Sequence, residues 1–204
     1  MHVISAADLT QMIALARTGS QDALGQLLEF YRSYLRLIAS LQISEKLQAK
    51  VSPSDLIQAT FLQAGKGFAE FQGHSEGELM AWLRKILASQ LAMEVRRYAT
   101  DRRNIQLERQ MHVEVDQSSV LLNFLAARGT TPSQSVMRRE RAVLLADALD
   151  KLPRDYRDII VQRHLKGLSF ADIAQLTNRS VDSVKSAWRR AILKLRESLG
   201  NGRL

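Results

Sequence analysis

The side chains best suited to chemistry in this sequence are basic and polar ones near its C-terminus. Six Lys or Arg side chains and one acid, Asp182, fall between residues 179 and 196. Arg and Lys donate hydrogen bonds to guanine and to phosphate oxygens, and Ser can contact either group. The candidate contacts to double-stranded nucleic acid are Ser180, Asp182, Ser183, Lys185, Ser186, Arg189 and Arg190.

Two helices joined by a tight turn are needed to present this set. Apolar residues recur at helical spacing from Phe170 to Leu176 and again from Val181 to Leu199, with a break at 177–179. Ser169 and Asp172 form a capping-box pattern at the first start, and Ser180 can cap the second. A solvated basic surface helix would explain the charge, but not the caps and the turn. The pattern therefore favours a helix-turn-helix.

Composition agrees with a nucleic-acid partner. The chain has 204 residues and a formal charge of +8, and residues 103–204 carry 18 basic and 11 acidic side chains against 11 and 10 in residues 1–102. There is no Cys and no apolar run of about 18 residues. The N-terminus does not resemble a signal peptide. We expect a cytoplasmic protein that does not insert into membranes, without cofactor or metal.

The periodicity elsewhere predicts an all-α protein of two helical domains. We expect helices over residues 5–18, 21–41, 53–71 and 78–98 in a first domain, residues 1–104. A flexible linker over 105–131 follows, where the periodicity weakens. Helices over 132–149 and 154–164, together with the helix-turn-helix, make a second domain, residues 132–204.

A second basic patch ends the first domain. Arginines and an aromatic side chain lie together there, which suits single-stranded nucleic acid because bases stack on aromatic rings while Arg follows the backbone. The patch comprises Arg96, Arg97, Tyr98, Arg102 and Arg103. A short polar loop, residues 72–77, lies between the helices predicted over residues 53–71 and 78–98.

Several motifs in order resemble the sigma-70 family of RNA polymerase sigma factors. They are Asp55-Leu56-Ile57-Gln58-Ala59-Thr60-Phe61, Ala81-Trp82-Leu83-Arg84-Lys85-Ile86, Leu152-Pro153 with Arg157, Gly167-Leu168-Ser169, Ile173-Ala174, and Ser180-Val181 through Val184-Lys185-Ser186 to Arg190-Ala191. The likeness covers nearly the whole chain. It is strongest to the small extracytoplasmic-function (ECF) type, which has only conserved regions 2 and 4.

The resemblance implies partners and roles. Core RNA polymerase would be bound through the clamp helices of its largest subunit and its flap, with Asp55, Gln58 and Thr60 as candidate contacts. Promoter −10 DNA would meet the loop residues Gln72, Gly73, His74 and Ser75 and the arginines of the second patch. The helix-turn-helix set would read the −35 element. An anti-sigma factor is a further partner that the family implies.

In this interpretation the free protein holds its two DNA-reading faces at no fixed distance, and core polymerase sets that distance. Two alternatives stay open. A conventional helix-turn-helix regulator would bind a duplex operator without polymerase, but leaves residues 55–103 unexplained. A nucleic-acid enzyme is disfavoured because the four histidines lack metal-ligand spacing and no phosphate-binding glycine loop or nucleophile motif occurs, so we assign no catalytic residue.

Overall fold

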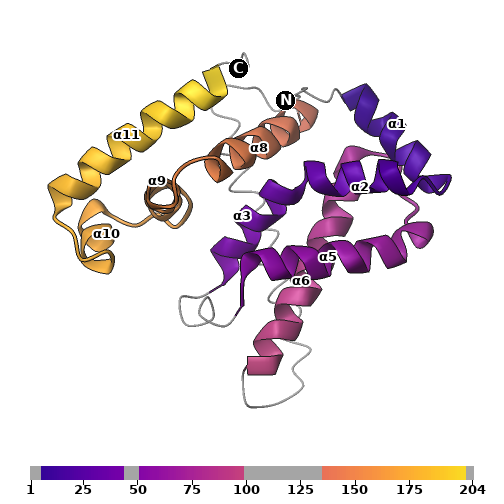
Figure 1. Cartoon of the computed structure of the whole chain (residues 1–204), viewed down its shortest axis with the longest axis horizontal. Helices are drawn as coiled ribbons and strands as arrows, with labels where there is room; N and C mark the ends of the chain where they lie inside the picture. The colour runs from indigo at the N-terminus through magenta and orange to yellow at the C-terminus, as the bar shows by residue number, and fades with distance from the viewer. Residues whose placement is uncertain (1–5, 44–50, 99–134, 201–204) are drawn as a thin grey trace.

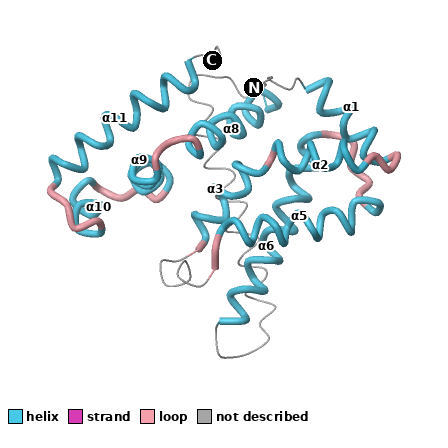
Figure 2. Tube along the Cα trace, in the orientation of Figure 1, coloured by secondary structure: helices cyan, strands magenta, loops and turns pink. Residues whose placement is uncertain are grey.

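The computed structural model describes residues 6–43, 51–98 and 135–200, and each regular element in these ranges is a helix (Figures 1 and 2). The predicted all-α class is therefore confirmed. The predicted linker, residues 105–131, lies outside the described residues, as do Arg102 and Arg103. The described part of the chain contains no helix that is both long and apolar enough to cross a membrane.

Three helices begin the chain: α1 (Ala6–Arg17), α2 (Gln21–Phe30) and α3 (Arg32–Gln42). The prediction of one helix over 21–41 was wrong, because the helix is interrupted at Tyr31. The backbone of Tyr31 has ψ near 0°, which departs from helical geometry. Its ring is fully buried, and its hydroxyl donates to Glu76 Oε1 at 3.3 Å, so tertiary contacts hold the interruption in place.

Two longer helices complete the N-terminal part. Ser52 caps α5 (Pro53–Gly67) by accepting a hydrogen bond from the Ser54 N–H, and Pro53 lies in the first turn. A 3₁₀ turn (Phe68–Glu70) follows, and then a loop leads into α6 (Glu76–Tyr98). Buried apolar side chains of α3, α5 and α6 form the core that fixes these helices, among them Leu35, Ile38, Ile57, Leu83 and Leu87.

The C-terminal part contains α8 (Ser135–Asp150), α9 (Arg154–Ile160), α10 (Phe170–Leu176) and α11 (Val181–Gly200). The helix predicted over 154–164 is α-helical only to Ile160 and ends in a π-helical turn (Val161–Leu165). A small second core unites α9, α10 and α11. It consists of Ile159, Ile173, Ala174, Val184 and Ala187.

Helix α8 joins the two parts of the molecule. It packs against α3 on one side and against α11 on another (Figure 1). Its buried residues, including Ala142, Ala146 and Leu149, belong to the same apolar core as Leu35 and Ile38 of α3. The expectation of two reading faces at no fixed distance therefore does not describe this structure, in which the C-terminal part rests on the N-terminal part.

Candidate nucleic-acid interface

The helix-turn-helix forms with the predicted caps. The Ser169 hydroxyl accepts from the Asp172 N–H at 3.1 Å, and the Asp172 carboxylate accepts from the Ser169 N–H at 3.0 Å. Hydrogen bonds to its carboxylate from the Ser169 hydroxyl and the Ser169 N–H lower the pKa of Asp172. Asn178 turns the chain with φ of +51°, a left-handed conformation that Asn tolerates better than most residues. Ser180 then caps α11 by accepting from the Ser183 N–H at 3.2 Å.

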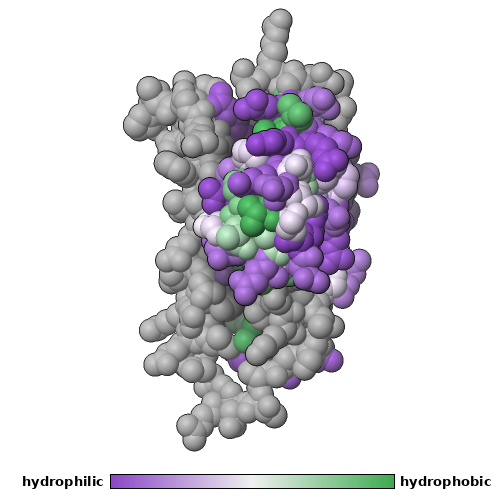
Figure 3. Space-filling model, turned by 90° about the vertical axis from the view of Figure 1, so that its left-hand side faces the viewer, coloured by the Kyte–Doolittle hydropathy of each residue, from purple (hydrophilic) through white to green (hydrophobic). Residues whose placement is uncertain are grey.

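The outer face of α11 carries the predicted contacts. Ser180, Asp182, Ser186, Arg189 and Arg190 are exposed, and Lys185 is half-buried. Figure 3 shows that the end of the molecule formed by α10 and the start of α11 has a largely hydrophilic surface. The helix thus presents a row of basic and polar side chains to solvent.

Ser183 differs from the other members of this set. Its hydroxyl accepts from Arg179 Nε at 3.3 Å and from Nη2 at 3.1 Å. This contact fixes the Arg179 guanidinium beside the first turn of α11. Arg179 was not among the predicted contacts, although its spacing of four residues from Ser183 could have indicated the pair.

The inner face of α11 is fixed by Trp188. Its indole Nε1–H donates to His164 Nε2 at 3.0 Å, and the two rings are stacked with centroids 6.0 Å apart. Phe170 packs edge-on against the same indole at 5.6 Å. Together with buried Val184 and Ala187, these contacts set the rotation of α11 about its axis and so decide which residues face outward.

The loop before α6 is held by a carboxylate that sequence reasoning missed. Glu78 Oε2 accepts from the N–H groups of His74 and Ser75, both at 3.0 Å, and from the Ser75 hydroxyl at 2.6 Å. These bonds, the hydroxyl first, lower the pKa of Glu78 to about 2. The spacing Ser75-x-x-Glu78 is a capping-box pattern and could have revealed this anchor.

Gly73 occupies a place where no side chain fits. A Cβ at this position would lie 2.3 Å from Phe71 Cζ and 2.9 Å from Glu78 Cβ. The Phe71 ring cannot move away easily, since it is buried against Phe68 and Trp82 with centroids 5.5 and 5.0 Å apart. The loop backbone therefore lies on an aromatic cluster, while the side chains of Gln72, His74 and Ser75 are exposed.

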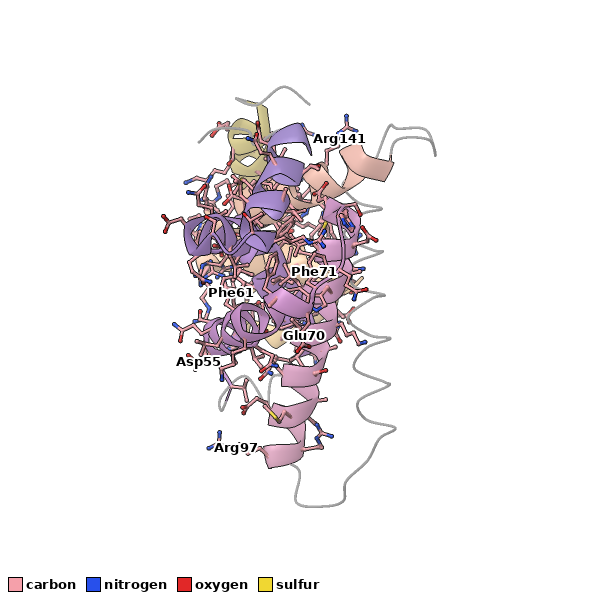
Figure 4. All side chains as sticks on the ribbon, turned by 90° about the vertical axis from the view of Figure 1, so that its right-hand side faces the viewer. Asp55, Phe61, Glu70, Phe71, Arg97 and Arg141 are labelled. Carbon is pink, nitrogen blue, oxygen red and sulfur yellow. The ribbon has the colours of Figure 1, made fainter. Side chains whose placement is uncertain are left out.

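The last turn of α6 carries the described part of the second basic patch. Arg97 is exposed and lies 4.0 Å from Glu94 Oε1, and Arg96 is half-buried. Figure 4 shows Arg97 at the end of α6 and Asp55 at the surface near the start of α5. Tyr98 ends the helix. The loop lies directly before the first turn of α6 and the basic patch lies in its last turn, so the two are at opposite ends of one 23-residue helix.

Helix α5 exposes two of its three predicted contacts. Asp55 and Gln58 are exposed, but the prediction for Thr60 was wrong. Thr60 has no exposed surface, and its hydroxyl donates to Leu56 O at 2.7 Å, because position 60 falls on the inner side of the helix. Sequence reasoning missed Leu62, which is 68% exposed on the same helix as Asp55 and Gln58. An apolar side chain so exposed suits a protein partner.

Metal chemistry has no support in the described ranges, which contain no group of three or more His, Asp or Glu side chains placed to bind an ion. The geometry instead combines a helix with a basic face, a fixed polar loop and a basic helix end.

Comparison with known proteins agrees with this geometry. Residues 142–195 match the family model described as Sigma-70, region 4. RNA polymerase sigma factor YlaC of Bacillus subtilis is 25% identical, covering 86% of this chain and 92% of its own. ECF RNA polymerase sigma factor SigW of the same organism is 22% identical, covering 94% and 96%. RNA polymerase sigma factor CarQ of Myxococcus xanthus is 29% identical, covering 90% and 93%.

The C-terminal part is therefore a helix-turn-helix domain of the sigma-70 region 4 type. Over nearly its whole length the chain is similar to RNA polymerase sigma factors, including ones of the ECF type.

Proposed function

We propose that this sigma factor directs core RNA polymerase to promoters in which α11 reads the −35 element and the loop before α6 reads the −10 element. Core polymerase and promoter DNA are the partners that the family implies. The division of the chain at residues 1–104, 105–131 and 132–204 is part of this proposal. The protein supplies binding energy and no covalent chemistry.

The observation that carries the proposal is the basic outer face of α11 within a capped helix-turn-helix. Exposed Arg189 and Arg190 and half-buried Lys185 are placed to reach base edges or phosphates from a helix in the major groove. Trp188 on the opposite face prevents the helix from rotating. Duplex DNA is the ligand that this arrangement fits.

The loop suits a different ligand. Its exposed polar side chains, Gln72, His74 and Ser75, rest on a backbone fixed by Glu78, and can surround a base that has left the duplex. Extruding a base costs a few kcal/mol, which contacts from the loop and from Arg96 and Arg97 would offset. Opened −10 DNA is therefore the proposed ligand of this part.

Helix α5 is the proposed contact to the clamp helices of the largest polymerase subunit. Asp55 and Gln58 offer polar contacts at its surface, and Leu62 offers an apolar one. An exposed apolar residue among polar neighbours is typical of an interface that forms and dissociates. The flap is the proposed partner of the C-terminal part, and an anti-sigma factor a proposed regulator.

The direct test is to mix the purified protein with bacterial core RNA polymerase, isolate the complex, and transcribe a pool of randomised promoters. We expect a stable complex and enrichment of promoters sharing two elements. Tight binding to duplex DNA without any association with core polymerase would contradict the proposal and favour a conventional regulator.

The loop assignment has its own test. Replacing residues 72–77 by the corresponding loop of SigW should change the preferred −10 sequence and leave the −35 preference as it was. An unchanged −10 preference in an active protein would show that the loop does not read the base.

A further inference from the structure

A cavity that neither DNA-reading region uses lies among the middle helices of the molecule. Its volume is about 390 Å³, and it is lined by residues of α3, α8 and α9, by the start of α5, and by the π-helical turn that follows α9. Small-molecule sites in proteins usually measure about 300–1,000 Å³. The cavity therefore has room for a ligand and not only for a single water molecule.

The wall of this cavity carries an excess of positive charge. Four cations and two carboxylates line it, which leaves a formal charge of +2: Arg36, Arg154, Arg157, Lys166, Asp150 and Asp158. Asp150 already pairs with Arg36 and with Arg157. Asp158 pairs with Arg154 at 3.6 Å. The exposed Lys166 forms no ion pair within the described part of the chain. An anion would complete the charge balance of the wall.

Arg36 has a hydrogen-bond donor that is not used. Its Nε is buried and has no partner among the described residues. Burial, followed by repulsion from Arg157 and Arg32, lowers the pKa of this guanidinium. A buried N–H without an acceptor is unfavourable, and an anionic oxygen is the acceptor that a cationic wall attracts most strongly. Guanidinium and ammonium groups together are suited to phosphate.

The cavity also offers an unused acceptor. Gln162 Oε1 is buried without a hydrogen-bond partner in the described ranges, and Gln162 belongs to the π-helical turn Val161–Leu165. Such turns are rare and are frequent at functional sites. The apolar side chains of Leu37, Leu149 and Val161 line the same cavity. A ligand that satisfies all of these groups needs an anion, an N–H donor and an apolar face.

We propose that this cavity binds a nucleotide, whose phosphate groups contact the cationic side chains and whose base donates an N–H to Gln162. The phosphates balance the charge of the wall, and the flat face of the base covers the apolar side chains. Inorganic phosphate would leave Gln162 and the apolar surface without a partner. The site goes beyond the proposed function, because nucleotide binding here requires neither promoter DNA nor core polymerase.

Calorimetric titration of the full-length protein tests the site. GDP and ADP are the probes, since both bases carry N–H donors, and inorganic phosphate is titrated in parallel. We expect one nucleotide per chain and phosphate binding at least tenfold weaker. The melting temperature should rise by about 5–10 °C at a hundredfold excess over Kd. Absence of binding by both nucleotides, or phosphate binding as tight as theirs, would overturn the proposal.

Lys166→Ala tests the charge of the wall. We expect this substitution to weaken nucleotide binding at least tenfold, because it removes a cation that has no ion pair in the described part of the chain. Lys151→Ala is the matched control. It removes the same charge from an exposed side chain that pairs with Asp147 and does not line the cavity. Equal effects of the two substitutions would show that the charge acts from a distance and would contradict the site.

Gln162→Leu tests the contact with the base. The substitution nearly preserves the size of the side chain and removes an acceptor that the protein does not use, so the fold should persist. We expect nucleotide affinity to fall about tenfold and phosphate affinity to stay the same. Circular dichroism checks the helices of this variant and of Lys166→Ala. An equal loss for nucleotide and phosphate, or no loss for either, would refute the placement of the base.

Hydrogen exchange shows where the nucleotide binds. The basic outer face of α11 is a competing site for anions, so the position must be measured and not assumed. We expect the nucleotide to increase protection over residues 33–40 and 154–166, which line the cavity, and not over residues 181–197. Protection confined to residues 181–197 would place the nucleotide at the proposed DNA interface and would overturn the proposal.

Discussion

The two parts of the molecule that we propose to bind nucleic acid use the same capping pattern for different purposes. Ser75 and Glu78 bond reciprocally before α6, as Ser169 and Asp172 do before α10. Before α6 the carboxylate orders the loop whose own side chains are the candidate readers. Before α10 it starts a supporting helix, and the candidate readers lie on α11, the next helix along the chain.

In α11, the contacts that hold the helix rigid and the side chains proposed to bind DNA are different residues. In the loop before α6, the same few residues do both. The outer residues of α11 depend on a 20-residue helix whose inner face is packed, so each can be replaced with little effect on the others. The loop depends on a few bonds and one close approach. We therefore expect substitutions on α11 to act singly, and substitutions in the loop to affect the whole loop.

The largest effect should come from removing Arg190, an exposed arginine of α11. Arg190→Ala should lower −35-dependent initiation about 5- to 150-fold, because a base or phosphate contact contributes about 1–3 kcal/mol. Lys185→Ala should act similarly. The affinity of both variants for core polymerase, measured by filter binding, should be unchanged. Arg17→Ala on α1 removes the same charge as Arg190→Ala and serves as control. An equal loss of core binding and initiation would contradict the assignment.

The next largest effect should come from Gly73, whose backbone lies close to Phe71 and Glu78. Gly73→Ala places a methyl group against Phe71 and the Glu78 side chain, and should cost about 1–3 kcal/mol of folding free energy by overpacking. We expect a lower midpoint in urea unfolding together with weaker −10 selectivity. Gly25→Ala on α2 meets no atom within 4 Å and should be neutral or stabilising. Equal stability of the two variants would disprove the tight fit.

A smaller effect should follow from removing the hydrogen bond between Trp188 and His164. Trp188→Phe deletes the hydrogen bond to His164 Nε2 and should cost about 1 kcal/mol of stability. Because an aromatic ring is kept at this position, we expect −35 affinity to fall by less than in Arg190→Ala. Thermal unfolding and duplex binding measured on the same sample would test this order. A loss of DNA affinity without any loss of stability would instead place Trp188 at the DNA.

The smallest effect is expected from pH. The folded-state pKa of Glu78, about 2, lies below the ordinary value of about 4.5. The bonds from His74 and Ser75 are therefore complete above about pH 4.5 and are lost as the pH falls toward 2. The protection of the amide protons of these two residues, measured relative to their intrinsic exchange rates, should fall over this range. Glu78→Gln should show the lower protection already at pH 7, and unchanged protection in that variant would contradict the anchoring role.

Local patterns in the sequence predicted much of the reading surface. The caps at Ser169 and Ser180 and the turn at Asn178 are determined by neighbouring residues, so the helix-turn-helix formed as expected. The loop anchor was equally local and was overlooked. Thr60 was misplaced because a family motif gives the order of residues and not which of them face inward.

Longer-range features could not be predicted in this way. Periodicity identifies the apolar stripe of α8 but not the helix that covers it, and the pairing of Arg36 with Asp150 joins residues 114 positions apart. The interruption at Tyr31 likewise depends on Glu76, 45 positions away. Such contacts result from how the helices assemble, and single-sequence patterns carry little information about that step.

The chain has two tryptophans, and they fall one in each reading part. Trp82 packs under the loop before α6 against Phe71, and Trp188 packs under α11 against His164. Each indole is thus a built-in optical reporter of its own half. A protein that keeps only Trp82 would report loop events by its fluorescence, and one that keeps only Trp188 would report −35 binding. The order in which a promoter is engaged could then be timed without attaching a dye.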